Sequence, residues 1–127
     1  MSNTVVLTLA NTMYVRDRNK HHPNTLAVVN NMGKLLKDQG RLDLAEPLFW
    51  RSLEGSERTL GPDDLHTLAS VNNLGSLLQA MGQLSLAETH YRRALEGFER
   101  TLGRDHPDTL MSVNNLGTLL KTMKKEK

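Results

Sequence analysis

The sequence has no cysteine, few aromatic residues and no long apolar run. The absence of cysteine among its 127 residues excludes disulfides and thiolate chemistry, and it suits the reducing cytoplasm, where we expect the protein. Aromatic residues make up 4% of the chain and hydrophobic residues 38%, which is too polar for a compact sandwich or barrel. No apolar stretch approaches the roughly 18 residues of a membrane-spanning helix, so we expect no membrane partner.

The charge balance and the first residues of the chain argue against two further classes of protein. The 16 Lys and Arg residues nearly balance the 14 Asp and Glu residues, for a formal net charge of +2. Nucleic-acid binding needs a concentrated basic face, so we expect no nucleic-acid partner. The first residues, MSNTVVLTLANTMYV, have no basic segment before their short apolar stretch and therefore do not resemble a secretory signal.

One short phrase occurs three times in the chain. VVNNMGKLL at residues 28–36, SVNNLGSLL at 70–78 and SVNNLGTLL at 112–120 are each 42 residues apart. The phrase ERTLG at residues 57–61 returns at 99–103 with the same step, and no gap is needed. A fixed period of this length indicates a repeat architecture.

Each repeat is predicted to hold two helices. Leu26, Val29 and Leu36 lie at helical steps and form one apolar stripe, and Gly40 follows as a left-handed stop. In the middle repeat a leucine replaces the proline that starts the other first helices, so Asp63 or Asp64 is expected to cap that helix. The same interpretation gives helices at about residues 24–39, 42–60, 65–81, 84–102 and 107–123.

Three glycines lie inside the first helices at the same phase, Gly33, Gly75 and Gly117. A glycine there costs about 1 kcal/mol relative to alanine, so we infer that a neighbouring helix approaches closely. Small residues of the second helices are the expected partners: Ala45, Ser52, Ala87 and Ala94. Hairpins packed in this way predict an all-α fold, an α-solenoid of antiparallel helix hairpins with about six helices.

The middle repeat resembles the tetratricopeptide repeat. The matching positions are Leu74, Gly75, Leu78, Gly82, Ala87, Tyr91 and Ala94. That family usually has a period of about 34 residues, and the 42-residue period here is similar to the repeats of kinesin light chain and nephrocystin-3. The resemblance covers about residues 20–120 and implies a scaffold that binds other proteins.

We divide the chain into four segments: an N-terminal helix and linker (1–21), a first repeat (22–63), a second repeat (64–105), and the first helix of a third repeat with a basic tail (106–127). Aligned on the repeat, Leu7, Ala10 and Tyr14 fall opposite Tyr91, Ala94 and Phe98, as in a degenerate second helix. The stretch YVRDRNK also resembles the end of a first helix. In both interpretations we expect a single helix packed on the first hairpin.

No constellation for catalysis or metal binding is found. His66 and His106 precede helices and are interpreted as polar boundary residues, and His90 has no ligand partner at helical spacing. The serines have no paired histidine, and the glycines are not clustered as in a phosphate-binding loop. We therefore expect no enzyme activity, no metal and no cofactor. Charged pairs at i,i+4, Glu88 with Arg92 and Glu96 with Arg100, are expected on a solvated face.

Tetratricopeptide arrays line a concave groove with the polar face of each first helix. By that resemblance the groove residues are Asn30, Asn31, Lys34, Lys37, Asn72, Asn73, Ser76, Gln79, Asn114, Asn115, Thr118 and Lys121. Side-chain amides can bond a peptide backbone of any sequence, and lysines at both ends favour an acidic ligand. In a second interpretation, compatible with the first, one asparagine of each pair bonds a neighbouring helix.

The leading hypothesis is a non-enzymatic scaffold that binds a protein or peptide segment in this groove. The alternative is a self-associating structural fragment, a homo-oligomer formed through uncapped terminal helices, because an odd helix at each end leaves apolar faces uncovered.

Overall fold

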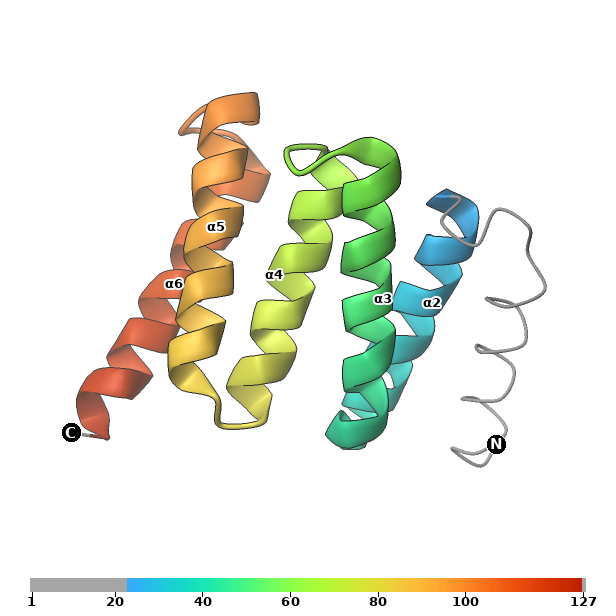
Figure 1. Cartoon of the computed structure of the whole chain (residues 1–127). Helices are drawn as coiled ribbons and strands as arrows, with labels where there is room; N and C mark the ends of the chain where they lie inside the picture. The colour runs from blue at the N-terminus through green and yellow to red at the C-terminus, as the bar shows by residue number, and fades with distance from the viewer. Residues whose placement is uncertain (1–22, 127) are drawn as a thin grey trace. The chain divides into compact units, whose positions relative to one another are not determined.

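The computed structural model describes residues 23–126, and all regular structure within them is helical (Figure 1). The helices are α2 (Pro23–Asp38), α3 (Leu42–Leu60), α4 (Leu65–Ala80), α5 (Leu84–Leu102) and α6 (Pro107–Lys125). The all-α prediction is therefore confirmed. The sixth helix, expected near residues 4–16, lies outside the described residues.

The chain divides into two units, Met1–Pro62 and Asp63–Lys127. In the first unit α2 and α3 form an antiparallel hairpin (Figure 1). In the second unit α4 and α5 form another hairpin, and α6 packs against α5. The boundary between the units falls one residue from the predicted junction of the first two repeats. The extents of the four predicted segments stay a prediction.

The ends of the helices follow from local chemistry. Asp64 caps α4, because its Oδ1 accepts a hydrogen bond from the backbone N–H of His66 at 2.9 Å. At the start of α6, Nδ1 of His106 accepts from the backbone N–H of Asp108 at 3.1 Å, with proline in the first turn. Gly40 has a φ of 79°, a left-handed conformation that side-chain-bearing residues rarely adopt, and so it ends the first helix of its hairpin.

Two of the three mid-helix glycines pack against aromatic rings. A Cβ built on Gly33 would lie 3.3 Å from Cε1 of Phe49, and one on Gly75 would lie 2.9 Å from Cδ1 of Tyr91. The expected small partners are therefore wrong as the main neighbours, although the carbonyl oxygen of Ala87 is also 3.5 Å from the Gly75 position. At Gly117 the expected close approach is missing, because no described atom lies within 4 Å of the added Cβ.

A further glycine contact was not predicted from the sequence. A Cβ on Gly97 of α5 would lie 2.8 Å from Cδ1 of Leu68, so α4 and α5 approach each other closely at two levels of the hairpin. Leu68 itself is 1% exposed. Gly97 recurs at the 42-residue step from Gly55, which is also buried, so the repeat carried a signal for it.

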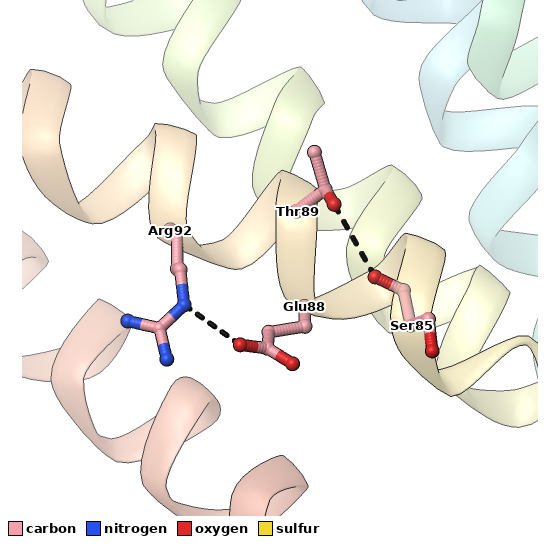
Figure 2. A network of polar contacts seen from close by, with 4 residues as sticks. All are labelled: Ser85, Glu88, Thr89 and Arg92. Carbon is pink, nitrogen blue, oxygen red and sulfur yellow. Dashed lines mark hydrogen bonds and ion pairs between the residues drawn. The ribbon is translucent and has the colours of Figure 1, made fainter.

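One of the two ion pairs expected on the outer face is present. Nε of Arg92 lies 2.8 Å from Oε2 of Glu88 along one face of α5, and Oγ1 of Thr89 donates to the backbone oxygen of Ser85 (Figure 2). Arg100 departs from the expected pairing with Glu96, because its Nη2 lies 2.7 Å from Oδ1 of Asp63. These side chains are largely solvated, so each pair contributes little to stability.

Candidate functional site

The polar residues of α4 are only partly available at the surface. Asn72 is 7% exposed, and its Oδ1 accepts a hydrogen bond from Nδ2 of Asn115 on α6 at 3.2 Å. Asn73, Ser76 and Gln79 are half-buried. The interpretation in which one asparagine of a pair bonds a neighbouring helix therefore describes Asn72 and Asn115. Their bond ties α4 directly to α6.

Two of the predicted groove residues are engaged by a tyrosine of α5. The hydroxyl of Tyr91 donates to Oε1 of Gln79 at 3.0 Å and is also hydrogen-bonded to Ser76. Burial raises the pKa of Tyr91 above its ordinary value of 10.0, and the hydrogen bond with Ser76 opposes that rise. This network holds the Tyr91 ring against Gly75. It also fixes two side chains that line the polar face of α4.

The sequence contained a signal for this network. Phe49 occupies the position of Tyr91 in the first repeat, and lysines stand there in place of Ser76 and Gln79. The hydroxyl and its two hydrogen-bonding partners therefore occur together in one repeat and are replaced together in the other. A position-by-position comparison of the two repeats shows that these three positions change together.

The polar residues of α6 are the most accessible of the predicted set in the second unit. Asn114, Thr118 and Lys121 are exposed, while Asn115 is half-buried and bonded to Asn72. The exposed three lie at helical steps of four and three residues, so they share one side of α6. An amide, a hydroxyl and an ammonium group on one side of a helix can bind backbone carbonyls and a carboxylate.

The first unit presents its own share of the prediction on α2. Asn31 and Lys34 are exposed, and Asn30 and Lys37 are half-buried. Lys34 and Lys37 supply positive charge on this helix, as the preference for an acidic ligand requires. Whether any of the twelve predicted residues binds a ligand stays a prediction.

A second surface, apolar in character, lies on α6. Leu110, Val113 and Leu120 are 53%, 48% and 37% exposed, and Met111 beside them is 48% exposed. Single exposed apolar residues are ordinary, whereas several along one helix mark a surface that a partner can cover. The three share one stripe with Gly117, at steps of three, four and three residues.

The histidines and acidic residues are the candidate metal ligands in the part of the chain that the structure describes. No three of these side chains gather closely enough between residues 23 and 126 to hold a metal ion. Nδ1 of His90 lies 2.9 Å from the backbone oxygen of Leu86, and His106 caps α6. None of the described helices has the length and apolarity to cross a membrane.

Solved structures with this fold are known. The chain is similar to a kinesin light chain-like protein of Podosopora anserina with nearly identical TPR-like repeats, at 22% identity and a TM-score of 0.81, over 92% of this chain and 55% of that one. A variant form of that protein matches at 21% identity with the same TM-score of 0.81 and the same coverage, 92% of this chain and 55% of that one. BtubC (BKLC) from P. vanneervenii matches at 24% identity and a TM-score of 0.74, over 80% of this chain and 40% of that one.

These likenesses establish the fold, and the chain spans about half the length of the structures that it matches. No curated protein matches the chain. The family model for the tetratricopeptide repeat matches residues 24–100 and again 67–127, which together include every described helix but the first residue of α2. The chain therefore belongs to the tetratricopeptide repeat family.

Proposed function

We propose that the protein is a non-enzymatic interaction scaffold whose first helices bind an extended peptide segment of a partner protein. The observation that carries the proposal is the arrangement of α6 in the second unit. Its amide, hydroxyl and ammonium groups at Asn114, Thr118 and Lys121 share one exposed side, and the Asn72–Asn115 bond fixes that helix to α4. The helix that carries these groups is therefore held in place before a peptide arrives, so binding does not have to order its backbone.

The charge of these surfaces favours an acidic peptide. Lys121 is exposed on α6, and Lys34 is exposed on α2 of the first unit. An exposed ammonium group adds long-range attraction for a carboxylate, and this attraction weakens as salt screens it. Binding of the selected peptides should therefore weaken as the salt concentration rises.

A peptide display screen against the immobilised protein tests the proposal. We expect enrichment of peptides with one or more Asp or Glu residues, and Lys121→Glu should weaken their binding by about tenfold or more, as charge reversal at a contact implies. Arg104→Glu, at an exposed position outside the predicted groove, is the matched control for the change in net charge. Equal loss in the two variants, or no enrichment over a blank surface, would contradict a site on α6.

Asn73→Ala gives a second test on α4. Asn73 is half-buried, so part of its side chain is accessible to a peptide, and its truncation should weaken the selected peptides. Loss of stability with unchanged peptide binding would assign Asn73 to helix packing and remove it from the site.

Self-association is a second candidate function, and the apolar stripe of α6 is the observation that favours it. Covering Leu110, Val113 and Leu120 would remove apolar surface from water. Sedimentation velocity over a wide range of protein concentrations is the test. A monomer at every concentration would exclude this function.

A further inference from the structure

The apolar stripe on α6 has a covered counterpart on α4. Leu110, Val113 and Leu120 follow Leu68, Val71 and Leu78 by 42 residues each. The residues on α6 are 53%, 48% and 37% exposed, whereas those on α4 are 1%, 0% and 0% exposed. The two helices therefore carry the same apolar stripe, and the structure shows on α4 what covers it.

The contacts of α5 with α4 identify the kind of segment that fits this stripe. The ring of Tyr91 lies over Gly75, and Leu68 lies against the bare Cα of Gly97. At Gly117, which follows Gly75 by 42 residues, the described residues leave the corresponding space open. A helix with an apolar side chain at the Tyr91 position and a small residue one turn later would fit there.

The sequence contains one further segment in that register. Residues 4–18 precede residues 88–102 of α5 by 84 positions, which is twice the repeat. Leu7 takes the position of Tyr91, Ala10 that of Ala94 and Tyr14 that of Phe98. The order apolar, small, aromatic is therefore kept, although residues 4–18 lie outside the described residues and their pairing is argued from sequence register.

Three buried positions depart from the α5 pattern. Asn3 stands in place of Ala87, Val6 in place of His90, and Met13 in place of Gly97. Met13 would meet Leu110, which is 53% exposed and so has room to turn aside, unlike the buried Leu68. Met side chains adapt readily to irregular gaps. The departures imply a looser fit than that of α5 on α4.

We propose that residues 4–18 of a second copy of the chain occupy the apolar stripe of α6 in the way that α5 occupies α4. This inference rests on the proposed self-association and names its surfaces. In the second unit α5, the second helix of its repeat, contacts α4 on one side and α6 on the other. A second helix can therefore pack between two first helices. By repeat register alone, residues 4–18 would take the place of α5 between two first helices, α2 of their own chain and α6 of another copy.

The other end of the described repeats supplies a matching observation. Leu35 of α2 is 47% exposed, whereas its counterpart Leu119 of α6 is fully buried at 0%. A second-helix segment covers the Leu119 position in the second unit, because α6 packs on α5. The interface joins one surface to a different surface of the next copy, so it is heterologous and allows growth beyond a dimer.

Disulfide trapping tests the pairing directly, since the chain has no cysteine to interfere. A tagged copy with Leu7→Cys is mixed with an untagged copy with Gly117→Cys under mild oxidation. We expect the mixed disulfide dimer to form at least about tenfold faster than with the control partner, Ser85→Cys on an exposed position of α5. Equal rates for the two pairings would overturn the proposal.

The same cysteines distinguish other occupants of the stripe. The double variant Leu7→Cys, Gly117→Cys at low concentration should remain largely free of an internal disulfide. A monomer closed by an internal bond would mean that the segment covers the stripe of its own chain, which overturns the assignment to a second copy. The Gly117→Cys variant can also be mixed with cysteine-bearing peptides from the display screen. If it traps these peptides and does not trap the Leu7→Cys copy, the stripe binds another protein, which overturns the proposal.

Sedimentation separates failure of this inference from failure of self-association. Val113→Glu should raise the dissociation constant by about tenfold or more, because a carboxylate resists burial. Ser85→Glu is the control and should leave it unchanged. Circular dichroism checks that the Val113 variant stays folded, as expected for a side chain already 48% exposed. If the protein associates equally well with Val113→Glu and gives no Leu7–Gly117 disulfide, the docking of residues 4–18 on α6 is wrong, while self-association stands. If the parent protein is a monomer, both the docking and self-association are excluded.

Discussion

α4 and α6 have closely similar sequences and very different surroundings. Both carry the SVNNLG phrase and the leucine stripe that follows it. In α4 nine residues from Thr67 to Leu78 are buried, whereas in α6 the buried residues are Thr109, Ser112, Leu116 and Leu119. The four positions that are buried in both helices form the side of α6 that packs on α5. The positions that are buried only in α4 include the apolar stripe, which α5 covers on α4 and which is exposed on α6.

This comparison shows that the position of a helix in the sequence and the burial of its residues are determined by different factors. Local pattern and capping set where each helix begins and ends, so α4 and α6 begin at equivalent caps, Asp64 and His106. Burial depends on which neighbour is present. A residue such as Gly75 or Leu78 is therefore critical in one helix, and its counterpart in the other helix should tolerate change.

The largest difference is expected at the glycines. Gly75→Leu should lower the free energy of unfolding by about 3 kcal/mol or more, because its Cβ alone would lie 2.9 Å from the buried Tyr91 ring. Gly117→Leu should be neutral or stabilise α6 by up to about 1 kcal/mol, because its Cβ meets no described atom within 4 Å and leucine is the better helix former. Urea unfolding followed by circular dichroism measures both, at a protein concentration low enough that association does not contribute. Similar losses in the two variants would show that an uncovered α6 is not what the protein has in solution.

A leucine pair should give the next largest contrast. Leu78→Ala leaves a cavity at a 0% exposed site and should cost about 3 kcal/mol. Leu120→Ala, at a 37% exposed site, should cost less than about 1 kcal/mol. Thermal unfolding at low protein concentration is the measurement, so that association does not contribute. If Leu120→Ala loses much more stability than this, and the loss grows with protein concentration, the apolar stripe of α6 is covered by an associated copy.

The asparagines should separate by a smaller amount. Asn115→Ala removes the donor to the buried Oδ1 of Asn72 and should cost about 1–2 kcal/mol, because that oxygen then lacks this partner. Asn114→Ala removes an exposed side chain and should change stability by no more than about 0.5 kcal/mol. The double variant Asn72→Ala, Asn115→Ala completes a cycle that isolates the bond. An additive double variant would mean that the 3.2 Å contact contributes nothing.

Much of the fold could be predicted because each boundary had a local cause. The predicted span of 42–60 matches α3, and that of 84–102 matches α5, since apolar stripes and left-handed glycines fix them. The polar face was harder to predict. Asn72 was predicted as a groove residue, with a bond to a neighbouring helix as the second interpretation. It is buried and bonded to Asn115 of α6, and no pattern within α4 identifies that neighbour.

The hydroxyl of Tyr91 gives the smallest and most specific contrast, because it bonds α4 through Gln79 and Ser76 and has no counterpart on α6 among the described residues. Tyr91→Phe keeps the ring over Gly75 and should cost only about 1 kcal/mol near neutral pH. The pKa of Tyr91 is raised in the folded protein, so the neutral form is favoured there. Its contribution is therefore fully present below the unfolded pKa of 10.0 and is lost as the pH rises from that value through the higher folded one.

The difference in unfolding free energy between the parent protein and Tyr91→Phe, measured by urea titration at several pH values, follows that contribution alone. It should stay constant from neutral pH to about pH 9 and then shift in favour of the phenylalanine variant as the pH rises further. Tyr14→Phe, which changes the other tyrosine, controls for ionisation of the unfolded chain. A difference that does not vary with pH would mean that the Tyr91 hydroxyl is solvated, and that Gln79 and Ser76 are available to a ligand in the same way as Lys121 and Thr118 on α6.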